Sequence, residues 1–331
     1  MKNKNETSGR LHRLKLRHTI LLSLRDYFHA QGFLEIEVPI LVKKTTPDTY
    51  IDSIQADGGY LTTSTEYQIK RLMAEGLEKV YTLTKNFRVH DRGRYHSPEF
   101  TMLEWGRAHA SLQNIEEDTV QFIRKAFRAL YPDQDSLNFN GNEINFMQGT
   151  WESLTVREAF EKHLGIKNLD DFSLKSLCKA SNEAGIDLPL DFQSDRSLAI
   201  SFLLDRLQSC LGKQTPTFLH EWPSYLTSSA PISSGDPHIA ERCELYIGGI
   251  EIANGFPFLT NPHKQRELFE EQNLKRKELG KPIIDLDEKY IQALKDLPQG
   301  AGMALGVDRL VMILTQASQL SDVQAFDWDE L

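Results

Sequence analysis

The alternation of hydrophobic and polar positions predicts a helix followed by a strand near the N-terminus. Residues 11–31 carry leucines and a phenylalanine at helical spacing among charged residues, and Gly32 follows as a stop signal. Residues 33–38 then alternate apolar and acidic side chains and end at Pro39, which is typical of an edge strand. The first ten residues are polar, and we expect them to form a flexible N-terminus.

The rest of the chain predicts strands, a helical run and strands again. Strands are expected at 60–63, 217–221 and 243–255, a hairpin from Val80 onward, and helices at 66–75, 113–130, 264–279 and 287–294. Residues 131–142 are rich in Pro, Asp, Asn and Gly, which predicts a loop. Residues 151–211 indicate a helical insertion, clearest at 156–163 and 196–211. This order favours an α+β fold with a largely antiparallel sheet flanked by helices.

Composition narrows the classes of protein. A chain of 331 residues with 40% hydrophobic residues forms one to three globular domains. Its apolar clusters are far shorter than the roughly 20 residues that span a bilayer. Three cysteines without a CxxC pair fit a reducing compartment, so we expect a cytoplasmic protein. The net charge of −9 argues against coating nucleic acid by bulk electrostatics.

One segment, residues 87–107, points to nucleotide chemistry. It reads FRVHDRGRYHSPEFTMLEWGR, which predicts two strands joined by a basic loop. Arg88, His96 and two further arginines gather cationic donors there, and Phe100 offers an aromatic face for a base. A hairpin of this composition can hold a polyphosphate.

A second segment, CELYIGGIEIANGF, predicts a hairpin that turns at Gly248 and Gly249, because both positions of such a turn need positive φ. The resulting register places Glu244 and Glu251 on one sheet face, roughly 7–8 Å apart at Cβ. Two such carboxylates can share Mg²⁺, or they can merely cover a solvated face. The same register puts Asn254 on the opposite face unless a bulge intervenes.

A third segment, GAGMALGVDRLVMIL at 300–314, predicts a glycine-punctuated strand that runs into a helix. Glycines let the backbone approach a ligand, and the helix N-terminus with Arg309 in its first turn favours negative charge. The segment is equally consistent with a tightly packed joint in which Arg309 pairs with a surface carboxylate.

Taken together, three motifs resemble the signatures of class II aminoacyl-tRNA synthetases, most closely the lysyl-tRNA synthetase branch. They are GFLEIEVPIL at the end of 16–41, FRVHDRGRYHSPEFTMLEW, and GMALGVDRL, and the resemblance covers about residues 11–320. It implies a class II catalytic domain at 11–331. The chain is too short for the family's anticodon-binding barrel, so we expect no anticodon-binding domain and no anticodon recognition.

The stretches TSTEYQIKRL and GIEIANGF make the chain similar to a paralogue of lysyl-tRNA synthetase that acts in translation, the elongation factor P (R)-β-lysine ligase family. The resemblance implies an ATP- and Mg²⁺-dependent ligase. Such an enzyme forms an aminoacyl-adenylate and transfers the aminoacyl group to a lysine of elongation factor P. It further implies a homodimer formed through residues 16–41.

The resemblance also assigns roles to the nucleotide-binding residues. Arg88 and Arg309 are the expected catalytic residues: Arg88 binds the α-phosphate and the substrate carboxylate, while Arg309 binds the outer phosphates with His96. Phe100 stacks on adenine. Mg²⁺ is expected on Glu244 and Glu251. The remaining members of the expected ATP-binding set are Val89, His90, Ser97, Ile252 and Gly306, with Glu251 shared between the ATP and the metal.

A second group of residues is implied to bind the amino acid. Glu66 is expected to hold its amino group, Glu104 to face the side-chain ammonium, and Asn254 to help fix the carboxylate. Ala304 matches the alanine with which this family narrows the pocket. The substrate-binding set is completed by Ser64, Thr65, Gly106 and Phe258.

Three positions depart from the pattern of the family. His90 replaces a glutamate that helps to read the adenine amino group. Gly106 replaces a tyrosine, and Phe258 replaces a glutamate that contacts the substrate ammonium. Because a buried cation that loses its compensation costs several kcal/mol, we hypothesise a less cationic or differently shaped amino acid, or a pocket that other residues rebuild.

Two other functions are compatible with these motifs. The ligase could act on a different carrier protein, a small molecule or a tRNA with a different amino acid, since only the acceptor distinguishes these cases. The chain could instead be a non-catalytic regulatory paralogue. Retention of Arg88, Glu244, Glu251 and Arg309 argues against that role, and His90 argues for it.

Overall fold

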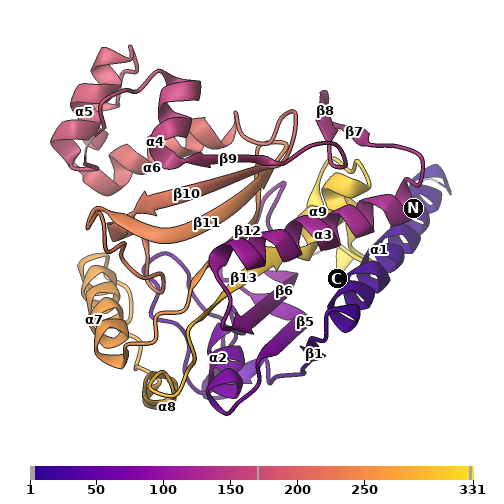
Figure 1. Ribbon diagram of the computed structural model, residues 1–331, viewed down its shortest axis with the longest axis horizontal. Coiled ribbons are helices and arrows are strands. Elements are labelled where there is room, and N and C mark those ends of the chain that lie inside the picture. Colours follow the sequence, from indigo (N-terminus) through magenta and orange to yellow (C-terminus); the bar gives the residue numbers. More distant parts are fainter. Residues whose placement is uncertain (1–3, 170, 328–329) are drawn as a thin grey trace. The chain divides into compact units, whose positions relative to one another are not determined.

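The computed structural model describes residues 4–169, 171–327 and 330–331 and divides into two units (Figure 1). Unit 1 comprises the chain up to Gln134 and from Gly255 onward, and unit 2 comprises Asp135–Asn254. Each unit contains paired strands and an apolar core of its own.

The sheet of unit 1 has the strand order β1 (Leu34–Glu35), β5 (Lys79–Phe87), β6 (Glu99–Ala108) and β13 (Gly300–Gly306). β1 pairs parallel with β5, and the other pairs are antiparallel. The register aligns Thr82, Glu104 and Ala304 across three strands. Between β1 and β5, the chain forms three short strands that pair in a separate sheet: β2 (Leu41–Val42), β3 (Gln55–Ala56) and β4 (Gly59–Leu61).

Helices α1 (Lys4–Ala30) and α3 (Leu112–Leu130) lie side by side in unit 1 (Figure 1). They cover one face of the sheet through aromatic contacts. Phe28 of α1 stacks on Tyr81 with ring centroids 4.6 Å apart, and Phe122 of α3 meets Trp105 edge-on at 5.2 Å. Since side chains alternate along a strand, Glu104 and Gly106 point to the other face.

Three more helices of unit 1 belong to a second apolar cluster. They are α2 (Glu66–Ala74), α7 (Pro262–Glu278) and α8 (Glu288–Ala293). Tyr67 of α2 stacks on Tyr290 of α8 at 3.9 Å, and Phe258 joins the same cluster. Unit 1 ends with α9 (Val307–Leu314), which follows β13 directly, and a 3₁₀ turn at Leu320–Val323.

Unit 2 contains a sheet of order β12 (Ile250–Pro257), β11 (Ile239–Ile247), β10 (Thr217–Pro223) and β9 (Glu152–Thr155), although the last residues of β12 belong to unit 1. Its helices surround a core in which Phe160, Leu203 and Leu207 are fully buried. The helical elements are α4 (Val156–Ala159), a π-helical turn at Phe160–Leu164, α5 (Leu174–Glu183), α6 (Arg196–Gln208), and 3₁₀ turns at Leu190–Gln193 and Ser224–Leu226.

Most predicted elements are present, but the N-terminal pair differs. The first helix begins at Lys4, well before residue 11. Hydrogen bonds from Arg10 to Glu330 and from Arg13 to the Asp322 carbonyl connect this end of the helix to the C-terminal segment. The strand predicted at 33–38 is reduced to the two residues of β1. It lies at the edge of the sheet, so it has one neighbouring strand to pair with, and Pro39 lacks the N–H that further pairing needs.

The loop predicted at residues 131–142 is wrong in its second half. Residues Ser136–Phe139 (β7) and Asn142–Asn145 (β8) form a hairpin around Asn140 and Gly141, whose φ angles are 49° and 79°. An Asn-Gly pair between alternating apolar residues is the preferred sequence of this turn, so the signal was present. β9, within the predicted helical insertion, is only four residues long and owes its pairing to β10, so periodicity alone does not identify it.

None of the helices in the described ranges combines the length and the apolar character that crossing a membrane requires.

Candidate active site

The basic hairpin of unit 1 holds an arginine against an aromatic ring. Arg88 follows β5, and its backbone N–H donates to the Pro98 carbonyl at 3.0 Å, which closes the loop between the strands. Its guanidinium carbon lies 5.1 Å from the centroid of the Phe100 ring. Among the described residues, its buried Nε has no hydrogen-bond partner, and neither do the two side-chain polar atoms of the buried Asn86. Because buried polar groups rarely stay unpaired, these atoms mark a place for a polar ligand.

An arginine and a histidine meet at the far end of the same loop. An Nη of Arg309 lies 2.7 Å from His96 Nε2, and Arg309 Nε donates to the Tyr95 carbonyl at 3.2 Å. Arg309 lies in the first turn of α9, for which Gly306 is the N-cap. A helix N-terminus and two basic side chains together favour an anion.

A cavity of about 280 Å³ opens beside this pair in unit 1. Its lining is rich in basic and hydroxyl groups and consists of Arg92, Gly93, Arg94, His96, Ser97, Pro98, Gln319, Leu320, Ser321, Gln324 and Asp327. His90 lies in the same loop with an exposed side chain and a φ of 64°, a left-handed conformation that histidine adopts more readily than most residues. The preceding Val89 donates its backbone N–H to Asp52 at 2.9 Å.

A buried ion pair joins α1 to α9, and its two side chains also bind β6. Asp308, which precedes Arg309, accepts from Arg17 Nη1 at 2.5 Å and from the backbone N–H of Thr101 at 2.7 Å. Arg17 Nη2 also donates to the Thr101 hydroxyl at 3.0 Å. Since Thr101 follows Phe100, one network fixes the aromatic residue and the arginine.

Three of the residues predicted to bind the amino acid form a hydrogen-bonded group on the sheet face opposite to α1 and α3. Glu104 is buried on β6 and accepts from the Ser64 hydroxyl at 2.5 Å, the Thr65 N–H at 2.5 Å and the Thr65 hydroxyl. Burial raises the pKa of Glu104, although these donors oppose the shift. Ala304, partly exposed, is its register partner on β13.

Glu66, the predicted ligand of the amino group, is paired inside the protein. It accepts from Lys70 Nζ at 2.5 Å, one turn further along α2. Lys70 is 2% exposed, and its Nζ lies 5.3 Å and 5.4 Å from the ring centroids of Phe256 and Phe258. Lys70 was not among the predicted site residues, although its position four residues after Glu66 on a helix is a signal for an ion pair.

The departures Gly106 and Phe258 lie against each other. A Cβ on Gly106 would lie 3.1 Å from Phe258 Cζ and 2.8 Å from Met73 Sδ. Gly302, the register partner of Gly106, and Gly300 approach the same ring equally closely. The Phe258 ring is therefore seated on a surface of three glycines.

The carboxylates of unit 2 are only partly solvated. Glu244 is 3% exposed, so it does not cover a solvated face, while Glu251 is half-buried. Glu244 accepts from Arg242 and, at 2.5 Å, from the Tyr246 hydroxyl. Burial and repulsion from Glu251 outweigh the attraction of Arg242 and raise the pKa of Glu244 to about 7.

The predicted turn at Gly248 and Gly249 is confirmed, since both have positive φ between β11 and β12. Arg242 Nε donates to Asn254 Oδ1 at 3.0 Å, and the same guanidinium binds Glu244. Strict alternation along the strand predicted that Asn254 and Glu244 lie on opposite faces of the sheet. This prediction is therefore wrong at the end of β12. Arg242 was also missed, although it lies two residues before Glu244 and so shares its face.

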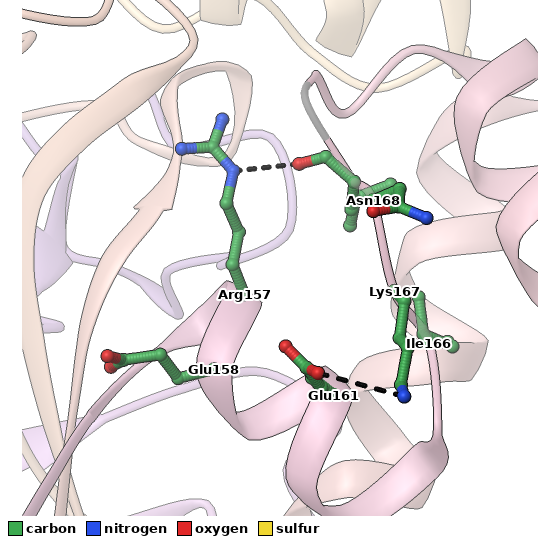
Figure 2. A pocket seen from close by; sticks show the side chains of 7 residues that line it. Arg157, Glu158, Glu161, Ile166, Lys167 and Asn168 are labelled. Carbon is green, nitrogen blue, oxygen red and sulfur yellow. Dashed lines mark hydrogen bonds and ion pairs between the residues drawn. The ribbon is translucent and has the colours of Figure 1, made fainter.

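A second cavity, of about 380 Å³, lies in the helical part of unit 2 (Figure 2). Its lining consists of Arg157, Glu158, Glu161, Ile166, Lys167, Asn168 and Leu169. Arg157 donates to the Leu169 carbonyl at 2.8 Å and binds Asp236, while Lys167 lies 4.0 Å from Glu161. These charges are already compensated, so we assign no ligand to this cavity.

Comparison with known proteins identifies the family. Residues 5–329 match the tRNA synthetases of class II (D, K and N). The chain belongs to this family. Its fold is that of the class II synthetases, and its chemistry is that of an ATP-dependent ligase.

Individual relatives within the class II family match over nearly the whole chain. The elongation factor P–(R)-β-lysine ligase of Photorhabdus laumondii is 37% identical, with 97% of this chain and 96% of the relative covered. The proteins of the same name from Salmonella arizonae and Hamiltonella defensa are 35% and 32% identical, covering 98% and 97% of this chain and 97% and 96% of the relatives. The resemblance inferred from the motifs is thus confirmed.

Proposed function

We propose that this class II ligase activates an amino acid with ATP and transfers it to a lysine of elongation factor P, with (R)-β-lysine or a related amino acid as substrate. The observation that carries the proposal is the similarity to ligases of that name over 97% of the chain and 96% of the relative. A shared activity of this kind is consistent with the retained Arg88, Phe100, His96 and Arg309.

In the first step, a carboxylate oxygen of the amino acid attacks the α-phosphorus of ATP, and the bond to pyrophosphate breaks. Charge neutralisation and positioning are the main demands of this reaction. We assign the α-phosphate and the attacking carboxylate to Arg88, the outer phosphates to His96 and Arg309, and adenine to Phe100. The contact of His96 with Arg309 supports this assignment, because His96 Nε2 accepts a hydrogen bond from the guanidinium and holds that cation beside the basic loop.

In the second step, the ε-amine of the acceptor lysine attacks the carbonyl of the adenylate. An amide bond forms, AMP leaves, and the amine loses a proton. We infer elongation factor P as the acceptor from the relatives, which are named for this reaction. A measurement of the intact mass of elongation factor P tests the inference directly.

Mg²⁺ fits the donor set of Glu244 and Glu251. Both are oxygen ligands, which Mg²⁺ prefers. Burial first and repulsion from Glu251 second raise the pKa of Glu244, and a divalent cation would relieve that repulsion. When bound, the ion would neutralise phosphate charge. Arg242 and Tyr246, which now bind Glu244, would hold that carboxylate in place.

A homodimer is part of the proposal. Leu22 of α1 is 48% exposed, Leu34 of β1 is 51% exposed and Leu41 of β2 is 45% exposed. Large exposed apolar side chains within one short segment are typical of a contact surface. The mass of the protein in solution tests this, and a monomer at micromolar concentration would contradict it.

The decisive experiment incubates the protein with ATP, Mg²⁺, a panel of α- and β-amino acids and purified elongation factor P. The intact mass of the acceptor should increase by one aminoacyl residue, and an acceptor whose modified lysine is changed to arginine should not react. Arg88→Ala should abolish the reaction. Pyrophosphate exchange without a mass shift would point to another acceptor, and the absence of exchange with every amino acid would favour a regulatory role.

A further inference from the structure

The protein supplies its own ammonium to the groups that could bind a cationic substrate. Lys70 Nζ donates to Glu66 at 2.5 Å and lies over the rings of Phe256 and Phe258 at 5.3 Å and 5.4 Å. A carboxylate and two aromatic faces are the elements of a cation-binding site. Because Lys70 is 2% exposed, the buried ammonium of this side chain itself occupies the site.

The second carboxylate of this region, Glu104, is already satisfied by the protein. It accepts three hydrogen bonds from Ser64 and Thr65, and a carboxylate has about four lone-pair positions in all. Glu104 is 4% exposed and buried with these donors around it. One lone-pair position of Oε1 is left, so a substrate ammonium would gain a single hydrogen bond from a carboxylate that three donors already hold.

The ring of Phe258 is fixed in position by its backbone and by the glycines beneath it. The Phe258 N–H donates to the Gly300 carbonyl at 2.8 Å. Cβ atoms on Gly300, Gly302 and Gly106 would lie 2.9, 3.1 and 3.1 Å from ring carbons, which is tighter than ordinary contact. The ring therefore occupies the space that a side chain at position 106 would need.

Gly106 and Glu104 are two residues apart on β6 and share a face, so the Cα of Gly106, against which the Phe258 ring lies, is about 7 Å along the strand from the Cα of Glu104. We take the substrate side chain to run past Glu104 and Ala304 toward this apolar ring, behind which Lys70 is paired with Glu66. An ammonium at this point would lose water without a carboxylate partner beside the ring, because Glu66 is paired with Lys70 and Glu104 lies further back along the strand. A neutral chain would pack against the ring.

We propose that the amino acid activated by this ligase has no positive charge at the end of its side chain. The substrate class is a neutral amino acid whose side chain is aliphatic or weakly polar. This inference rests on the proposed function and specifies the substrate of the same site.

Matched pairs of amino acids test the inference in ATP–pyrophosphate exchange. (R)-3-Aminohexanoic acid is (R)-β-lysine without its distal amine, and norleucine is lysine without its distal amine. In each pair the neutral member should have the higher kcat/KM, by about 100-fold or more, which is the expected effect of burying an uncompensated cation. A preference for (R)-β-lysine or lysine would overturn the inference and leave the ligase function intact. Exchange with no amino acid would refute both.

Two variants extend the test to the residues themselves. The double substitution Gly106→Tyr with Phe258→Glu removes the ring and restores a hydroxyl and a carboxylate, so the preference should move toward the cationic member of each pair. Phe258→Leu is the matched control, because it removes the ring without adding charge, and the neutral preference should persist. An unchanged preference in a folded double variant would contradict the roles of these residues. The comparison of substrates in the wild-type protein needs no variant and decides the inference even if the double variant fails to fold.

Discussion

Substitution of Arg17 by methionine should destabilise the protein strongly, because it removes one partner of a buried ion pair. The Asp308 side chain is 3% exposed and that of Arg17 is 15% exposed, with 2.5 Å between Arg17 Nη1 and Asp308 Oδ1. In the variant, the Asp308 carboxylate stays buried and keeps the Thr101 N–H as a donor. Leaving a buried charge without its partner typically costs about 3–5 kcal/mol.

Urea unfolding measures this loss against a control on the same helix. At a slope of about 3 kcal/mol per molar urea, a loss of about 3 kcal/mol lowers the midpoint by about 1 M. Arg25 of α1 forms a similar pair with Glu35, but both side chains are about 40% exposed. Arg25→Met should therefore cost less than about 1 kcal/mol. Equal midpoints for Arg17→Met and Arg25→Met would refute the reasoning.

The same substitution should weaken the use of ATP. Thr101 and Asp308 adjoin Phe100 and Arg309, so loss of the network lets both nucleotide-binding residues shift. We expect the KM for ATP to rise about tenfold under conditions where the variant remains folded, since small misplacements in a site have large effects. An unchanged KM for ATP in folded Arg17→Met would show that the network serves stability alone.

Three further predictions concern single side chains. Phe100→Ala should raise the KM for ATP by roughly 10- to 100-fold, as expected for a lost stacking surface, whereas Phe100→Tyr should stay close to the wild type; equal KM values for the two variants would exclude stacking. Glu251→Gln should raise the Mg²⁺ concentration needed for half-maximal pyrophosphate exchange, and an unaltered Mg²⁺ titration would remove Glu251 from the metal site. Burial raises the pKa of Glu104 in the folded protein above its ordinary value, so its stabilising contribution is complete below the unfolded pKa and is lost as the pH rises through the folded pKa. The stability of the wild type relative to Glu104→Gln should therefore decrease as the pH rises above 4.5, measured by urea unfolding at several pH values, and a difference that is independent of pH would contradict the shift.

The sequence predicted the parts of the fold that depend on local signals. Glycine pairs, helix caps and apolar periodicity act over a few residues, and they located the turn at Gly248 and Gly249 and the helices α2, α3 and α7. The hairpin at Asn140 and Gly141 was not predicted, because the polar residues of this segment are typical of a loop and obscure the turn signal of the Asn-Gly pair. β1 and β9 could not be recognised by periodicity, since strands of two and four residues are defined by their neighbours.

The candidate site was predicted through its motifs, but its internal pairing was not. Lys70 and Phe258 are far apart in the sequence, so their contact follows from the packing of α2 against the strand region and not from any local pattern. Likewise, the link between Arg17 and Asp308 spans almost the whole chain. Such contacts decide which carboxylates remain available to a ligand, and motif spacing carries no information about them.

The glycine surface beneath Phe258 has a consequence for how such a pocket can change during evolution. A tyrosine at position 106 and a phenylalanine at position 258 compete for one space, so neither replacement is neutral by itself. Losing the side chain at 106 first leaves a void the size of a ring, whereas gaining the ring at 258 first creates a steric clash. Each single replacement is therefore expected to destabilise the pocket, and exchange of one pair for the other requires both positions to change.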